Sequence, residues 1–470
     1  MPALQTPHQA LSSLWATLGG APAALDAVTL TGTEPVLPSS FAVGTAAQAS
    51  IAAAALAACE VGVLRGGPPQ QVRVDMHHAA AEFRSERYLR IHGEPPADPW
   101  DRIAGFYRTG SGGGVRVHTN FPHHRDGILR LLGCEYDKAA VARALLERDA
   151  VEFETLASDA GLCVAALRSM AEWDALPQAR AVAGLPVLSV TRIDASPVRP
   201  LQPLPAGARP LHGLRVLDLT RVVAGPVAGR TLAAHGADVM LVTAAHLPAI
   251  DTLVVDTGRG KRSAQLDLRT PAGREALQAL VRQADVFLQG YRPGGLAALG
   301  FGPDALARLR PGIVCASLTA YGPIGPWARR RGFDSLVQTA SGFNVAEAEA
   351  AGSTEPRPLP AQALDHASGY LLAFGIARAL ARRATEGGSW HVQVSLAQTA
   401  HWLRGLGRVP GGLAAPDPSL DDVRGLLEES DSGFGRLLAV RHAGQLERTP
   451  PTWTRPAVPL GSHRPVWTDQ

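Results

Sequence analysis

The sequence has few cysteines, few aromatic residues and no marked excess of charge of either sign. Its 470 residues include four cysteines, and aromatic residues make up 5%. The formal net charge of +3 is small and dispersed, so we expect no nucleic-acid partner. Cys59, Cys134, Cys163 and Cys315 have no spacing typical of a metal site or a disulfide framework. We therefore expect reduced thiols in a cytoplasmic protein.

Signals for export and for membrane insertion are also missing. The first thirty residues lack a basic start followed by an apolar run, so no secretory signal is expected. The longest apolar stretches, such as 49–58 and 370–380, are shorter than the roughly 20 residues that span a bilayer. The sequence thus predicts no membrane partner.

Proline and glycine are abundant, at 37 and 49 residues, and the prolines mark candidate boundaries. The proline-rich stretch 196–211 fits neither a helix nor a central strand, so it predicts an extended linker. A second region rich in breakers begins at Pro410. We divide the chain into a region 1–200, a linker at 201–211, a domain at 212–408 and a C-terminal tail at 409–470.

Apolar runs of strand length alternate with helix-like segments in the middle of the chain. The expected strands are 214–219, 237–242, 285–289 and 313–318, and the expected helices are 227–235, 271–282 and 303–308. This alternation predicts βαβ units and a parallel sheet. The expected fold class is α/β, a Rossmann-like parallel sheet with flanking helices, plus a smaller α+β domain.

Two distant segments share one pattern of helix, glycine turn, alternating strand and second helix. The first covers 49–63 and 72–82, and the second covers 370–383 and 392–402. An aspartate precedes only the second copy, at Asp365 in LDHASG. The predicted repeat is therefore chemically asymmetric.

Five stretches of the middle region together resemble the class III CoA-transferases, the group of formyl-CoA and carnitine CoA-transferases. They occur in the family's order: LHGLRVLDLTRVVAGPVAGRTLAAHGADV (211–239), TGRGKRSAQLDLRTPAGREAL (257–277), ADVFLQGYRPGGLAALGFG (284–302), GIVCASLTAYGPIGPWARRRGFDSLVQTASG (312–342) and ALDHASGYLLAFGIARAL (363–380). Region 1–200 is similar to the family's later half with its small domain, so the order of parts is permuted. The resemblance implies an enzyme that moves CoA between an acyl-CoA thioester and a carboxylic acid through an aspartyl covalent intermediate.

The resemblance also implies the site residues. Asp365 matches the nucleophile, although an acid at a helix start can instead be an N-cap, and His366 is expected to point outward from that helix. CoA and acyl-CoA are expected as substrates, with no tightly bound cofactor. The implied CoA contacts are Val223, Ala224, Leu266, Arg269, Gly290, Tyr291, Arg292, Arg331, Gly332, Phe333 and Asp334.

Further features of the sequence are interpreted as structural. The histidines at 77, 78, 118, 123 and 124 have no HExxH pattern and no cysteine at ligand spacing, so no metal site is expected. The glycine run 110–114 predicts a hairpin turn rather than the glycine-rich flap of the family. Family members are homodimers, and the broad apolar faces of 49–59 and 370–381 favour a homodimer here.

Two alternative functions stay open. The first is an α-methylacyl-CoA racemase-like isomerase, whose relatives carry a His–Asp pair where this chain has Phe333 and Asp334. The second is a non-catalytic CoA-binding homologue. Phe333 argues against the racemase, and the retained Asp365 argues against loss of activity.

Overall fold

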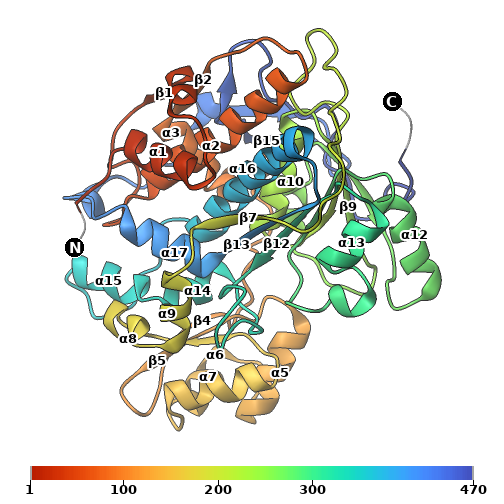
Figure 1. The fold of residues 1–470 in the computed structure, drawn as a ribbon. Coiled ribbons are helices and arrows are strands. Elements are labelled where there is room, and N and C mark those ends of the chain that lie inside the picture. Colours follow the sequence, from red (N-terminus) through yellow and green to blue (C-terminus); the bar gives the residue numbers. More distant parts are fainter. Residues whose placement is uncertain (1–2, 468–470) are drawn as a thin grey trace.

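A seven-stranded, mostly parallel sheet forms the centre of the computed structural model, which describes residues 3–467 (Figure 1). The strand order is β10-β9-β8-β11-β12-β13-β7, and only β7 runs antiparallel to its neighbour. The strands are β7 (Leu188–Arg192), β8 (Arg215–Leu219), β9 (Asp238–Thr243), β10 (Lys261–Gln265), β11 (Val286–Gln289), β12 (Val314–Thr319) and β13 (Trp390–Ser395). The six parallel strands have the doubly wound order of Rossmann folds, so the predicted fold class is confirmed.

Alternate residues along these strands pack against two different helix layers. Val216 and Val286 belong to one core with α10 (Ala224–Ala234) and α16 (Ala363–Glu386). Leu217 and Phe287 belong to a second core with α12 (Pro271–Val281) and α13 (Pro303–Leu309). Both faces of the sheet are therefore covered, which explains why strands such as β9 and β11 have apolar residues at most positions.

The two copies of the predicted repeat have the same elements and pack against each other. They are α2 (Val43–Leu64), β2 (Val72–Asp75) and α3 (Met76–Glu82) in the first copy, and α16, β13 and α17 (Leu396–Gly405) in the second. Helices α2 and α16 lie side by side within one chain (Figure 1). The apolar faces that favoured a homodimer are thus buried against each other, and the homodimer stays a prediction.

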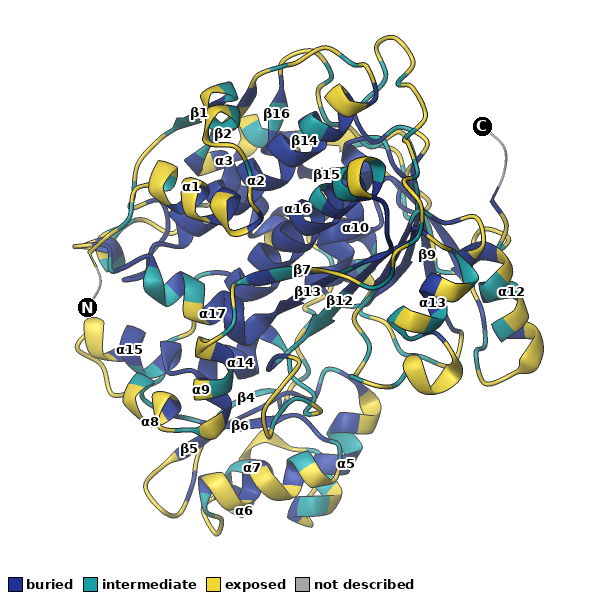
Figure 2. Cartoon of the chain, viewed as in Figure 1, coloured by how far each residue is buried: buried dark blue, intermediate teal, exposed yellow. Residues whose placement is uncertain are grey.

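Helix α2 is long and apolar enough to cross a membrane, by length and composition alone. The expectation that every apolar stretch is too short to span a bilayer is therefore wrong for this helix. However, 83% of its most apolar window is buried inside the molecule (Figure 2). A helix that is apolar all round and covered by protein is typical of a globular core.

The smaller α+β unit lies at one end of the molecule, at the bottom of Figure 1. Val115, Ile128 and Phe153 belong to its separate core. The turn between its first two strands contains residues 110–113 and Gly114 begins the second strand, so the expected hairpin is confirmed. Its elements are β4 (Gly105–Arg108), β5 (Gly114–Val117), β6 (Val164–Ala166), α5 (Pro122–Leu132), α6 (Lys138–Leu145) and α7 (Ala150–Asp159).

Two further small sheets join the two ends of the described chain. One contains β1 (Val28–Thr31), β2 and β16 (Gln445–Leu446), and the other contains β14 (Leu427–Ser430), β15 (Leu437–Val440) and β3 (Arg90–Ile91). The remaining helices are α1 (Pro7–Thr17), α4 (Ser85–Tyr88), α8 (Met170–Asp174), α9 (Pro177–Ala183), α11 (Asp251–Thr257), α14 (Asp334–Ala340) and α15 (Phe343–Ala350), with short 3-10 turns at 22–27, 297–299, 412–414 and 424–426.

The packing does not follow the boundaries drawn at residues 200 and 409. Strand β7, from region 1–200, completes the main sheet, and 409–470 supplies β14, β15 and β16. The proline-rich segment 201–211 contains neither helix nor strand, as expected for a linker. It lies against the end of α2, where Arg65 donates hydrogen bonds to the carbonyls of Gln202 and Pro210.

Candidate active site

A cavity of about 300 Å³ opens where β8, β11 and β12 end. Leu219 and Leu318 near the ends of their strands, and Gly290 directly after β11, line it together with the start of α10. In a doubly wound sheet this is the switch point, where the connections leave in opposite directions and ligands bind. The cavity thus lies where the strand order alone predicts a ligand site.

The loop between β8 and α10 has a strained backbone at the wall of this first cavity. Val222 has a φ of 73°, a left-handed conformation that costs a β-branched residue on the order of 1–3 kcal/mol. This turn places Val223 and Ala224 in the lining, and α10 begins there without a side-chain cap. The first backbone N–H groups of α10 have no intrahelical acceptor, so they are suited to an anionic ligand.

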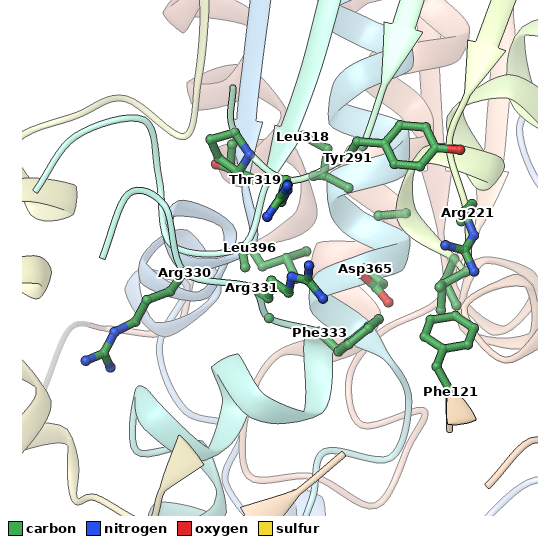
Figure 3. Close-up of a pocket in the computed structure, with 18 of the residues that line it drawn as sticks. Phe121, Arg221, Tyr291, Leu318, Thr319, Arg330, Arg331, Phe333, Asp365 and Leu396 are labelled. Carbon is green, nitrogen blue, oxygen red and sulfur yellow. The ribbon is translucent and has the colours of Figure 1, made fainter. Parts of the chain in front are cut away.

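The four arginines that line the first cavity differ in what they contact. Arg330 forms an ion pair with Glu154, and Figure 3 shows its side chain turned away from Asp365. Arg221 donates a hydrogen bond to a carbonyl of the next loop. Within residues 3–467, no hydrogen bond or ion pair engages the side chains of Arg292 and Arg331. These two guanidinium groups are therefore available to phosphate or carboxylate groups of a ligand.

Asp365 lies in the first turn of α16 and lines the first cavity (Figure 3). It is 7% exposed. Asp334 Oδ2 accepts hydrogen bonds from the backbone N–H groups of Leu364 (2.8 Å) and Asp365 (2.9 Å). The carboxylate that caps this helix is therefore that of Asp334. The Asp365 side chain caps no backbone group in residues 3–467, which leaves its carboxyl group for chemistry.

Burial and neighbouring acids raise the pKa of Asp365 well above its usual value. Loss of hydration is the largest cause, and the charges of Asp334 and Glu86 add to it. Burial also raises the pKa of Asp334 to about 6, although hydrogen bonds from the Asp365 N–H and from Gln338 stabilise its charged form. Of the two acids, Asp365 is therefore the one that keeps its proton to higher pH.

A second cavity, of about 230 Å³, also reaches Asp365. Most of its remaining lining comes from the region before residue 260, including Glu86 and Trp100. His118 in this lining stacks on Phe333, with ring centroids 3.9 Å apart. The residues shared by both cavities are Val222, Val223, Phe333 and Asp365.

The structure brings most of the predicted CoA contacts together. Asp334 lines the second cavity beside Asp365. Leu266 and Arg269 line neither cavity: Leu266 is buried in the core, and the Arg269 side chain is 67% exposed and paired with Asp267 at 2.7 Å. The contacts that line the first cavity are Val223, Ala224, Gly290, Tyr291, Arg292, Arg331, Gly332 and Phe333.

The sequence reasoning missed what the smaller unit contributes. Phe121, His123 and His124 line the first cavity, although the histidines were interpreted as structural. Their position at the start of α5, a few residues after β5, was the available signal, but the sequence does not tell which way this helix start points. In residues 3–467 no group of three or more His, Cys, Asp or Glu side chains is arranged to hold a metal.

His366 does not point outward, so that expectation was wrong. The residue is 1% exposed, and its Nε2 lies 3.2 Å from Glu86 Oε2. Its ring stacks on that of Phe83, with the ring centroids 5.4 Å apart. Helix α16 is covered on nearly every side, which an alanine-rich sequence alone does not reveal.

Fold and site together define an α/β protein with a ligand crevice at the switch point of its sheet. Arginine side chains line this crevice, and the buried carboxyl group of Asp365 faces it without capping a helix. Residues 211–406 match the model of CoA-transferase family III. The predicted family resemblance is thus confirmed over this part of the chain.

Two relatives and one solved structure illustrate the similarity. A probable fatty acyl-CoA transferase of Mycobacterium tuberculosis, Rv3272, is 35% identical over 231 residues, which are 45% of this chain and 58% of the relative. A succinate–glutarate CoA-transferase of Agrobacterium fabrum is 32% identical over 201 residues, 41% of this chain and 49% of the relative. A crystal structure of Rv3272 aligns with 38% identity and a TM-score of 0.40, covering 42% of this chain and 56% of that one. The chain spans about half the length of these relatives.

Proposed function

We propose that this chain is a CoA-transferase that moves CoA from an acyl-CoA thioester to a carboxylic acid, with Asp365 as covalent nucleophile. The observation that carries the proposal is the buried carboxyl group of Asp365, which caps no helix end and lies where two cavities meet. A thioester in the first cavity brings its carbonyl carbon to this carboxyl group, and the second cavity leaves room for an acid. The match of 211–406 to the model of CoA-transferase family III supports the same class of reaction.

The reaction requires only a carboxylate and a good leaving group. The Asp365 carboxylate attacks the acyl carbonyl carbon, the C–S bond breaks, and CoA departs as a thiolate. A mixed anhydride between the acyl group and Asp365 remains. The thiolate then attacks the aspartyl carbonyl, which releases the first acid and gives an aspartyl–CoA thioester. The second acid attacks this thioester and expels the thiolate again. Attack of the thiolate on the new acyl carbonyl completes the exchange and restores the Asp365 carboxylate.

Several side chains of the first cavity suit the parts of CoA. Arg292 and Arg331 are suited to its phosphate groups, since no hydrogen bond or ion pair within residues 3–467 engages their side chains. The backbone of Val223 and Ala224 is suited to the pantetheine arm and the thioester oxygen. Leu266 and Arg269 stay predicted CoA contacts, and their distance from the lining makes Arg331 the more important cation.

The racemase alternative is less well supported. Its chemistry requires a base that removes a proton from the carbon next to the thioester carbonyl. Phe333 occupies the position of the expected histidine, and His118 stacks on it. Burial lowers the pKa of His118 to about 3, so its imidazole is a poor base for a carbon acid.

The variants Asp365→Asn and Asp365→Ala test the covalent role. Both should reduce transfer below a few per cent of wild type, because neither side chain forms an anhydride. Incubation with acyl-CoA should add CoA to wild type, and mass spectrometry after borohydride reduction should find Asp365 modified. Asp304→Asn, an exposed acid at the start of α13, is the matched control and should keep full activity. Substantial turnover by Asp365→Asn would overturn the nucleophile assignment, and absence of any adduct on wild type would favour a non-catalytic CoA-binding protein.

We propose that the reaction takes place in the cytoplasm, without a tightly bound cofactor. All four cysteines are free, and three of them are buried. Such thiols persist in a reducing compartment.

A further inference from the structure

The second cavity has a partly apolar wall, and its volume limits the size of the group that it encloses. Trp100, Ile250 and Leu253 contribute to the apolar wall beside Phe333. Its volume of about 230 Å³ exceeds the ~150 Å³ of an engineered cavity that binds benzene. The volume of the cavity therefore matches a group somewhat larger than a benzene ring and is smaller than that of a long fatty chain.

Two buried polar side chains in this lining have no partner. His118 is 4% exposed, and neither of its ring nitrogens forms a hydrogen bond within residues 3–467. The Ser335 hydroxyl is also buried without a partner there. An unpaired buried polar group costs about 1–3 kcal/mol, and a bound polar group removes that cost. Because the His118 imidazole is neutral, it offers one donor and one acceptor but no positive charge.

The charges in the lining are mainly acidic. Glu86, Asp98 and Asp334 line the cavity together with Asp365. Arg87 is the one cation among the described residues of the lining, and it is exposed. A ligand that places a second carboxylate in this cavity brings like charges together, which is unfavourable in a partly buried site.

We propose that the second cavity holds the body of the acid that reacts at Asp365, and that its lining selects short acids with a single carboxylate against dicarboxylic acids. The inference rests on the proposed function and adds a substrate class to it. The reacting carboxyl group lies at the junction of the two cavities, and the remainder of the acid extends between Trp100 and Ile250. Uncharged polar groups on that remainder pair with His118 and Ser335.

A matched pair of acceptor acids tests the selection directly. Succinamate and succinate have the same number of heavy atoms and differ by one charge. With acetyl-CoA as donor, kcat/KM for succinamate should exceed that for succinate by about tenfold or more. Across butyrate, octanoate and hexadecanoate, activity should fall with length. Equal or better use of succinate, or of hexadecanoate, would overturn the proposal.

A charge variant in the wall supplies the reverse test. Ile250 is partly exposed at the start of α11, so a lysine there is compatible with folding. Ile250→Lys should reduce the preference for succinamate over succinate by about tenfold, because the ammonium group offsets the acidic lining. Ile250→Met, of similar size and uncharged, should keep the preference. An unchanged preference in Ile250→Lys would contradict the assignment of this cavity.

The adduct on Asp365 separates the two levels of inference. If CoA adds to Asp365 but both acids react equally well, the proposed function stands and the selection is wrong. If no adduct forms and neither acid is consumed, the proposed function itself fails. Binding of the two acids in the presence of CoA, measured by ligand-observed NMR, then still tests the cavity. Equal binding of succinate and succinamate would overturn the inference.

Discussion

The carboxyl group of Asp365 is buried beside Asp334 and Glu86, and no described residue forms a hydrogen bond or an ion pair with it. These neighbours disfavour its charged form, yet only the charged form is a nucleophile. A carboxylate that is poorly stabilised in the resting protein loses little when it becomes an acyl anhydride. The same features that suit the residue to covalent chemistry therefore make its ionisation costly to the fold.

The variant Asp365→Asn should be more stable than wild type at neutral pH. Below about pH 4 the acid is protonated in both the folded and the unfolded chain, so its raised pKa has no effect. As the pH rises, the unfolded chain releases the proton first, and the native state loses about 1.4 kcal/mol per pH unit until the folded pKa is reached. Asparagine carries no such proton. Urea unfolding of both proteins at several pH values should show a difference that grows with pH.

Asp304→Asn controls for the loss of a carboxylate at an exposed helix start. A wild type that is more stable than Asp365→Asn at neutral pH would contradict the direction of the pKa shift. At this scale the sequence identified the nucleophile candidate through its family motif. It could not show that Asp334, 31 residues earlier, caps the helix in its place, because that contact depends on how α14 packs against α16.

At the scale of elements, the site depends on the close crossing of α10 and α16. A Cβ atom on Gly369 would lie 2.6 Å from the carbonyl oxygen of Ala224 and 2.8 Å from Val227 Cβ. Ala224 lines the first cavity, and Gly369 lies one turn after Asp365. Because Gly369 has no side chain, α16 approaches α10 this closely, and the proposed nucleophile lies near the loop proposed to hold CoA.

Gly369→Ala should therefore weaken both stability and transfer. Overpacking at this contact costs about 1–3 kcal/mol, and a shift of Asp365 by ~1 Å reduces kcat/KM by about a hundredfold. Gly405→Ala is the control, since a Cβ there meets nothing within 4 Å. Urea unfolding and the transfer assay on both variants test the difference. A Gly369→Ala protein with wild-type stability and turnover would show that the helices separate without cost.

Elements of the main sheet were predictable where the sequence is apolar, and less so elsewhere. Strands β8, β9, β11 and β12 begin or end within one residue of the expected ranges. Strand β10 (KRSAQ) is missing from the prediction because its buried Lys261 looks like a surface residue. The structure pairs this lysine with Asp218 at 2.8 Å, a contact between strands that local pattern cannot reveal.

At the scale of the whole molecule, the repeat is a pair of similar units of which one carries the acid. With Val72 aligned on Val392, Thr45 falls opposite Asp365. The backbone N–H of Thr45 donates to Glu34 at 2.7 Å, much as that of Asp365 donates to Asp334. The first copy thus retains a capping carboxylate but has a hydroxyl where the second has the nucleophile.

The repeat was visible in the sequence as a pattern, but its packing was not. The sequence of an alanine-rich helix does not show whether it packs against a helix of the same chain or of a second chain. The expected homodimer was therefore one of two arrangements that suit these apolar faces. Within this chain α2 packs on α16, and Arg378 forms an ion pair with Glu60 across that contact. Mass measurement in solution distinguishes a monomer from a homodimer.

Separate expression of the two parts tests whether region 1–200 completes the enzyme. Without it, 211–470 should be insoluble or inactive, because α16 loses the cover of α2 and the main sheet loses its edge strand β7. The fragment also lacks Glu86, Trp100 and His118 of the second cavity. Co-expression of 1–200 should restore solubility and part of the transfer activity, whereas co-expression of 1–200 with Asp365→Asn in the larger fragment should restore solubility alone. A fragment 211–470 that folds and turns over unaided would show that the second cavity is dispensable and that the N-terminal copy of the repeat has another role.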